Sequence, residues 1–162
     1  MPKLQGLSID EFVNYQPAPN TVAISFNSKL DQRFNPDLYE QLNAKYQAYE
    51  ATLVIRADDV TKPVEDCQVF TKHDAQAIKD FVKQYHDHNI VVHCNAGVSR
   101  TGSVIHYIQQ EYPYFQLVGQ QDFSFNPLIS YLLDVRQDNP QRLFSENQAM
   151  MEDFVSQKLF NQ

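Results

Sequence analysis

The sequence predicts an α/β fold with three layers, in which a mostly parallel central sheet is flanked by helices. Short apolar runs have the length and the β-branched composition of buried strands, and amphipathic helical patterns lie between them. Strands that alternate with helices predict a parallel sheet covered on both faces. The chain has 162 residues, the size of one ordinary domain with its own core. We therefore expect residues 1–162 to form a single domain.

The first half of the chain predicts two helices and two strands. Ser8 and Glu11 form a capping-box pattern, which is typical of a helix start. Asn35 followed by Pro36 predicts a second helix start, because proline suits the first helical position. The expected elements are a helix over 8–15, a strand over 21–26, a helix over 35–50 and a strand over 52–56.

The second half continues the alternation. Thr71 and Asp74 form another capping box, and the apolar residues after them recur at helical spacing. The expected elements are a loop over 57–66, a helix over 71–85, a strand over 90–92, a helix over 101–110, an irregular connection over 114–125, a helix over 126–136 and a last helix after Ser145. The expected functional site lies at the carboxyl ends of the strands.

Residues 93–101 read His-Cys-Asn-Ala-Gly-Val-Ser-Arg-Thr and join the strand over 90–92 to a helix. Such a loop is an anion site, because backbone N–H groups converge there and the helix dipole adds positive potential. The helix N-terminus and Arg100 both favour the nucleophilic thiolate form of Cys94. Arg100 also offers a planar fork of donors that matches two phosphate oxygens. A thiolate beneath a phosphate cradle predicts a phosphatase.

The other loop residues have expected roles of their own. Gly97 permits the backbone conformations that turn amides inward. We expect Thr101 to donate its hydroxyl to the sulfur when the thiolate leaves, and His93 to organise the loop by hydrogen bonding rather than to act as a base. The expected phosphate-binding residues are Asn95, Ala96, Gly97, Val98, Ser99 and Arg100.

The spacing H-C-x-x-G-x-x-R-[S/T] resembles the signature of the cysteine-dependent protein tyrosine phosphatases. The resemblance covers residues 21–136 in pattern, and it is specific at the loop and at residues 54–60. The chain is more similar to the compact dual-specificity-like and small microbial branch, because it has no room for the recognition loop of the classical branch. The resemblance implies a cysteinyl-phosphate intermediate, with no metal and no other cofactor.

The reaction needs a proton for the leaving group and later a base for the attacking water, and one carboxylic acid can serve both steps. The loop after the strand over 52–56 carries the candidates. The resemblance places the acid at Asp59. Asp58 and Asp66 remain alternatives, and we otherwise interpret both as solvated loop carboxylates.

The expected substrate is a phosphorylated protein or peptide, with phosphotyrosine first and phosphoserine or phosphothreonine as further candidates. An RNA 5′-triphosphate, a lipid phosphate or a sugar phosphate is the alternative, although the net charge of −7 disfavours nucleic acid and positions 95–99 carry no cation. A catalytically inactive phosphate-binding module is a further alternative, which the intact Cys94, Arg100 and Asp59 disfavour. The sequence leaves the oligomeric state open.

Other residues carry weaker signals. The aromatic residues of the irregular connection are candidate substrate walls or core residues: Tyr114, Phe115, Phe123 and Phe125. Asn126 begins a helix that in the family packs near the site, and a capping role explains it equally well. Cys67 is expected to be buried and inert, with a disulfide to Cys94 as the alternative. The five histidines show no metal-binding spacing.

Composition also bears on the compartment. No apolar stretch approaches the roughly 20 residues of a membrane span, and the first residues lack the pattern of a signal peptide. Two cysteines do not make a disulfide framework, and a thiolate enzyme needs reducing surroundings. We therefore expect a cytosolic protein without membrane association.

Overall fold

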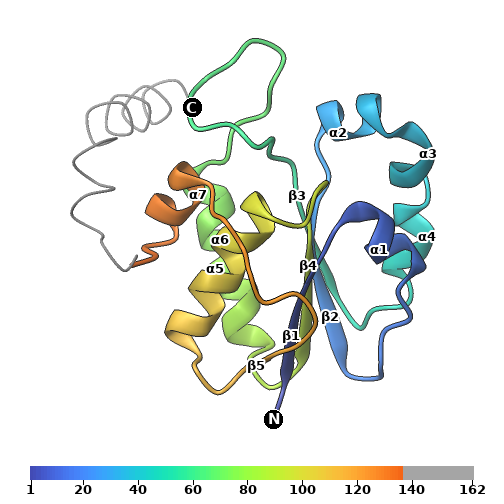
Figure 1. Ribbon diagram of the computed structural model, residues 1–162, viewed down its shortest axis with the longest axis vertical. Helices are drawn as coiled ribbons and strands as arrows, with labels where there is room; N and C mark the ends of the chain where they lie inside the picture. The colour runs from blue at the N-terminus through green and yellow to red at the C-terminus, as the bar shows by residue number, and fades with distance from the viewer. Residues whose placement is uncertain (137–162) are drawn as a thin grey trace.

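The computed structural model describes residues 1–136, which are built around a five-stranded sheet (Figure 1). The strand order is β3-β2-β4-β1-β5, and all the strand pairs run parallel. The strands are β1 (Lys3–Leu7), β2 (Thr21–Phe26), β3 (Thr52–Ile55), β4 (Asn89–His93) and β5 (Gln116–Leu117). The predicted α/β class with a parallel sheet is confirmed.

Helices cover both faces of the sheet, as Figure 1 shows. One side carries α1 (Ile9–Asn14), α3 (Pro36–Tyr39) and α4 (Leu42–Tyr46), with α2 (Lys29–Phe34) above the strand ends. The other side carries α5 (Lys72–Gln84), α6 (Ser99–Glu111) and α7 (Pro127–Leu132). The predicted three-layer arrangement is therefore confirmed for the described residues.

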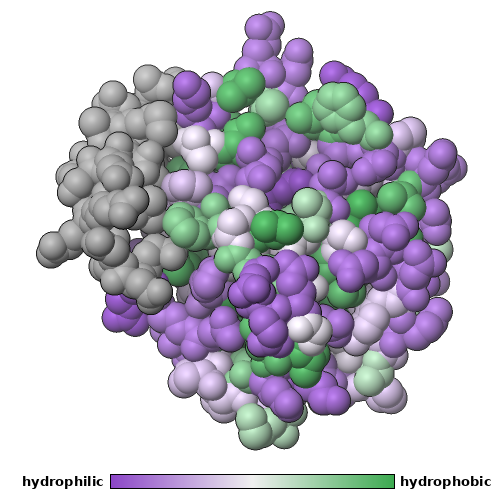
Figure 2. Space-filling model, viewed as in Figure 1, coloured by the Kyte–Doolittle hydropathy of each residue, from purple (hydrophilic) through white to green (hydrophobic). Residues whose placement is uncertain are grey.

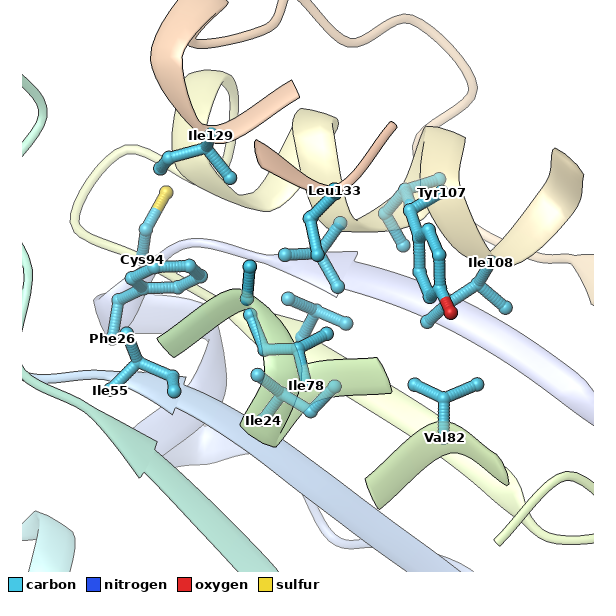
Figure 3. Close-up of a cluster of buried hydrophobic side chains, with 14 of the residues drawn as sticks. Ile24, Phe26, Ile55, Ile78, Val82, Cys94, Tyr107, Ile108, Ile129 and Leu133 are labelled. Carbon is cyan, nitrogen blue, oxygen red and sulfur yellow. The ribbon is translucent and has the colours of Figure 1, made fainter. Parts of the chain in front are cut away.

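Each face of the sheet has its own hydrophobic core. Side chains alternate along the central strands, so Val22, Ile24 and Phe26 join the larger core under α5, α6 and α7. Ala23 and Val91 face the smaller core under α1, α3 and α4. Figure 3 shows the larger core, with the sulfur of Cys94 at one end of it.

Some elements differ from the sequence-based expectations. Strand β1 was not expected, and it forms because β4 and β5 flank it in the sheet. The helix expected over 35–50 is two short helices, α3 and α4, and α2 precedes them. The helix expected after Ser145 lies outside the described residues, which also do not cover the whole of the expected single domain.

The topology gathers the loops of the site. Strands β2, β3 and β4 are neighbours, and all end at the same edge of the sheet. The segment after β2 leads into α2, the segment after β3 carries the acidic loop, and the segment after β4 carries the cysteine loop. No helix within residues 1–136 is long and apolar enough to cross a membrane.

Candidate active site

The loop after β4 has a fixed backbone. Cys94 is 2% exposed, and its Sγ accepts a hydrogen bond from the N–H of Gly97 at 3.2 Å. Gly97 has φ +74°, and a Cβ there would lie 2.6 Å from the carbonyl carbon of Leu7. The loop is also tied to α1, because the N–H of Ile9 donates to the carbonyl of Asn95 at 3.1 Å. Glycine is therefore required at position 97, and the sulfur has a backbone donor that stabilises a thiolate.

His93 supports this loop from below. Its ring is fully buried and stacks on Phe12 with 4.2 Å between centroids. Nδ1 lies 3.2 Å from the carbonyl oxygen of Cys94 and must donate to it, so Nε2 accepts from the hydroxyl of Ser25 at 2.5 Å. Tyr46 extends the chain with a 2.6 Å hydrogen bond to Ser25. Burial lowers the pKa of His93 to about 4, so the ring is neutral near pH 7 and suits the expected organising role.

Arg100 is held beneath the loop with one edge left open. Its side chain is buried, and Asp31 binds it bidentately, with Nη1–Oδ2 at 2.8 Å and Nη2–Oδ1 at 3.0 Å. Nη1 also donates to the carbonyl of Ala57 at 2.8 Å. Of the five guanidinium donors, this leaves Nε–H and one Nη2–H, which point the same way. Nε is buried without a partner among the described residues, so this edge is suited to two phosphate oxygens.

Asp31 is a site residue that the sequence analysis missed. It is the third residue of α2 and completes a capping box with Ser28, whose Oγ accepts from the Asp31 N–H at 3.0 Å. Burial alone would lower the pKa of Arg100, but the hydrogen bonds and charge of Asp31 raise it, so the guanidinium is charged at every working pH. The capping pattern was present in the sequence, but nothing local linked its carboxylate to Arg100.

Asp59 stands beside the cavity with one oxygen engaged. Its Oδ1 accepts from the hydroxyl of Ser99 at 3.0 Å and from the Nδ2 of Asn126 at 2.8 Å. No hydrogen bond to Oδ2 is present among residues 1–136. The side chain is exposed and lines the cavity above Cys94. Asp59 therefore has the position expected of a general acid.

The two alternative acids lie in different surroundings. Asp58 is 3% exposed, so the expectation that it is solvated is wrong. Its Oδ1 accepts from the hydroxyl of Ser28 and its Oδ2 from the N–H of Gln68, so it braces the loop. Asp66 is exposed at φ +66° and does not line the cavity. Asp58 has no free oxygen for proton transfer in this arrangement.

The cavity above Cys94 has a volume of about 390 Å³. Its lining residues are Leu30, Asp31, Phe34, Asp58, Asp59, Val60, Cys94, Asn95, Ala96, Val98, Ser99 and Arg100. Phe34 and Val98 belong to an apolar rim and are 75% and 37% exposed. Figure 2 shows such apolar side chains scattered over a largely hydrophilic face. The lining combines one buried cation with an apolar mouth.

The four aromatic residues of the irregular connection, which were candidates for substrate walls or for the core, do not form walls of the cavity. None of the four expected residues lines the cavity, and Phe34 of α2 takes that place. Phe115 is part of the larger core. Tyr114 is exposed, and its hydroxyl donates to the carbonyl of His86 at 3.0 Å. An exposed aromatic residue has no distinctive local pattern, so the sequence offered no signal for Phe34.

Further expectations concern Thr101, the second cysteine and metal-binding residues. Thr101 Oγ1 is buried and forms no hydrogen bond with the described residues, so its expected role toward Cys94 stays a prediction. Cys67 is partly exposed rather than buried, and both cysteines are free thiols. Burial, together with Asp58 and Asp66, raises the pKa of Cys67. Residues 1–136 hold no cluster of three or more potential metal ligands among His, Cys, Asp and Glu.

Comparisons with known proteins found a family model and a solved structure that are similar to this chain. A family model described as "Polymorphic toxin system, DSP-PTPase phosphatase" matches residues 33–110, a span that contains the acidic loop and the cysteine loop. Among solved structures, one titled "Crystal Structure of PTPMT1" is similar at 16% identity, with a TM-score of 0.45, over 91% of this chain and 95% of that chain. No curated protein matches.

Proposed function

Since this chain belongs to the cysteine-dependent phosphatase superfamily, we propose that it hydrolyses phosphotyrosine in proteins or peptides through a cysteinyl-phosphate intermediate. The composition of the cavity lining carries this proposal. Arg100 is the one cation among the lining residues of the described chain, and Asp31 already balances its charge. A triphosphate or a lipid with several phosphates would meet too few cations there, whereas an aryl monoester presents one phosphate and an apolar ring.

The first half-reaction transfers the phosphoryl group to sulfur. The thiolate of Cys94 attacks phosphorus, and the bond from phosphorus to the phenolic oxygen breaks. The loop amides and the open edge of Arg100 bind the equatorial oxygens as their charge rises. Asp59 gives its proton to the departing phenoxide, so tyrosine leaves neutral.

The second half-reaction frees the enzyme. Asp59, now a carboxylate, takes a proton from a water that attacks phosphorus, and the bond between sulfur and phosphorus breaks. Inorganic phosphate leaves, and Cys94 returns to the thiolate form, which the N–H of Gly97 stabilises. Thr101 is proposed to donate to the departing sulfur. Because Cys94 must stay a free thiol, we propose the cytosol as the site of action.

The decisive experiment measures phosphate release from para-nitrophenyl phosphate against pH, with EDTA present, for the wild type, Cys94→Ser and Asp59→Asn. We expect metal-free activity, complete loss in Cys94→Ser, and loss of the fall on the basic side of the profile in Asp59→Asn. Turnover in Cys94→Ser would contradict the covalent mechanism. An unchanged profile in Asp59→Asn would move the acid elsewhere, and an inactive wild type would favour the phosphate-binding module.

Substrate class is tested separately by comparing a phosphotyrosyl peptide, a phosphoseryl peptide, an RNA 5′-triphosphate and a lipid phosphate. The proposal expects the highest kcat/KM for the phosphotyrosyl peptide and a lower value for the phosphoseryl peptide. A higher kcat/KM for the RNA or the lipid would replace the protein substrate while keeping the phosphatase.

The description of the matched family also supports a cellular role, and we propose that this chain serves as the phosphatase of a polymorphic toxin system. Induced expression of the wild type in a bacterial cytosol is then expected to slow growth. Expression of Cys94→Ser at the same level is expected not to do so. Equal growth of the two strains would contradict this role without affecting the proposed chemistry.

A further inference from the structure

We propose that Asn126 and Ser99 are positioning residues that hold Asp59 by Oδ1, so that its catalytic proton resides on Oδ2. This inference rests on the proposed function, in which Asp59 is the general acid. It assigns a part in the reaction to Asn126, a residue near the end of the described chain that is not among the residues lining the cavity.

Two donors converge on the same oxygen of Asp59. Ser99 Oγ and Asn126 Nδ2 both donate to Oδ1, at 3.0 Å and 2.8 Å. A protonated carboxyl group carries its proton on the oxygen that accepts no hydrogen bonds, because an O–H on Oδ1 would face the incoming N–H and O–H groups. The proton is therefore directed to Oδ2, which has no hydrogen-bond partner among residues 1–136 and belongs to a side chain that lines the cavity.

The orientation of the Asn126 amide is set by the helix that it begins. Asn126 is 1% exposed, and its Oδ1 accepts from the N–H groups of Leu128 and Ile129 at 3.0 and 3.1 Å. The NH₂ group must then face the acidic loop, where it donates to Asp59 and also to the carbonyl of Val60 at 3.2 Å. The capping role and the positioning role thus use opposite ends of one amide.

The backbone of Asn126 is fixed to the helix of the cysteine loop. Ser103 of α6 accepts from the N–H of Asn126 at 2.8 Å and donates to its carbonyl at 3.1 Å. Gly102 of α6 precedes Ser103, and a Cβ at position 102 would lie 1.8 Å from the carbonyl oxygen of Ser124. Only glycine at this position therefore lets the segment before Asn126 pack on α6. The acid and the cysteine loop are therefore braced against one helix, and Asp59 is in place before substrate arrives.

The test uses Asn126→Asp, which keeps the capping oxygen and the side-chain size but turns a carboxylate oxygen toward Asp59. Two adjacent carboxylates retain a proton to higher pH than one alone. The fall of kcat/KM on the basic side, measured with para-nitrophenyl phosphate, is expected to move upward by about one pH unit or more. Ser99→Ala, which removes the other donor, is expected to move it in the same direction by a smaller amount.

Ser130→Ala is the matched control, because Ser130 bonds Ser103 at 2.8 Å in the same buried region and does not touch Asp59. Its pH profile is expected to coincide with that of the wild type. The titratable groups that share the cavity with Asp59 are Asp31, Asp58, Cys94 and Arg100, and all are unchanged in these variants.

The outcomes separate this inference from the proposed function. If the wild type is active and both Asn126→Asp and Ser99→Ala keep its pH profile, the positioning role is wrong and the phosphatase stands. If Asn126→Asp fails to fold, Ser99→Ala decides alone, because its side chain caps no helix. An inactive wild type overturns the proposed function first, and this inference with it.

Discussion

The two halves of the site are built in different ways. The cysteine loop, residues 93–101, is one continuous stretch whose shape follows from a strand end, a positive φ at Gly97 and a helix N-terminus. The groups around it come from distant segments: Asp31 reaches Arg100 across 69 residues, and Asn126 reaches Asp59 across 67. The continuous half carries the proposed nucleophile and the proposed phosphate cradle. The assembled half orients those groups and shapes the mouth of the cavity.

The largest expected effect falls on the continuous half. Arg100→Lys keeps the positive charge, but an ammonium group cannot bind Asp31 and two phosphate oxygens in parallel. We expect kcat/KM with para-nitrophenyl phosphate to fall by about 10³-fold. Arg56→Lys is the control, because Arg56 is exposed and outside the catalytic cavity. If kcat/KM falls by less than tenfold in Arg100→Lys, a positive charge alone is enough to bind the phosphate, and the planar fork of donors is not required.

The next effect tests the assembled half. Asp31→Asn leaves the buried guanidinium of Arg100 without its charged partner, so we expect the free energy of unfolding to fall by about 3 kcal/mol. We also expect kcat/KM to fall by roughly 10- to 100-fold, because the open edge of Arg100 is no longer aimed. Asp37→Asn makes the same charge change on an exposed residue and is expected to change neither the free energy of unfolding nor kcat/KM. Chemical denaturation measures the free energy of unfolding, and steady-state kinetics measures kcat/KM. Equal stability of Asp31→Asn and Asp37→Asn would contradict the role of Asp31 as the partner of Arg100.

The sequence predicted the fold where local patterns were strong. The strands over 21–26 and 52–56 and the helix after Thr71 were found within a residue or two, because composition and capping agree there. Strand β1 has Gln5 and Gly6 between its apolar residues Leu4 and Leu7, so it lacks a strong local pattern and depends on its neighbours β4 and β5. The helix expected over 35–50 breaks into α3 and α4, although the apolar residues Leu42 and Tyr49 of this segment are buried.

The site was predictable to the same degree. The cysteine loop could be interpreted because its chemistry lies in adjacent residues, whereas only the resemblance to the family separated Asp59 from Asp58 and Asp66. Asp31 could not be predicted, since a capping box indicates where a helix starts and says nothing about what its carboxylate faces. For Asn126 the sequence left open a capping role and a place near the site, and the three-dimensional structure shows both, with one end of its amide on the α7 backbone and the other on Asp59.

The pH dependence of stability tests how His93 supports the loop. Burial lowers the pKa of His93 to about 4, whereas an unfolded histidine titrates near 6.5, so below that value the unfolded state binds the extra proton. Stability from this source is present above about pH 6.5 and is lost by about 3 kcal/mol as the pH falls toward 4. His93→Asn has no titrating group. The difference in unfolding free energy between wild type and variant should therefore shrink across that range, and a constant difference would contradict the neutral ring.

The smallest expected effect concerns Phe34, the aromatic residue that lines the cavity. Phe34 lines the cavity and is 75% exposed, so Phe34→Ala is expected to leave stability unchanged but to lower kcat/KM for a phosphotyrosyl peptide by about tenfold. A phosphoseryl peptide, which brings no ring, should change by less than about twofold. Tyr114→Ala removes an exposed aromatic residue outside the cavity and should change neither value.

The comparison of the two peptides decides what Phe34 does. A loss confined to the phosphotyrosyl peptide means that the assembled half of the site selects the substrate through its apolar rim. An equal loss for both peptides would mean that Phe34 holds α2, and with it Asp31, in place. In that second case Phe34→Ala would resemble Asp31→Asn, which is expected to weaken catalysis and also to lower stability. In the first case the two variants differ, so Phe34 selects the substrate and Asp31 holds Arg100, although both residues belong to the same short helix.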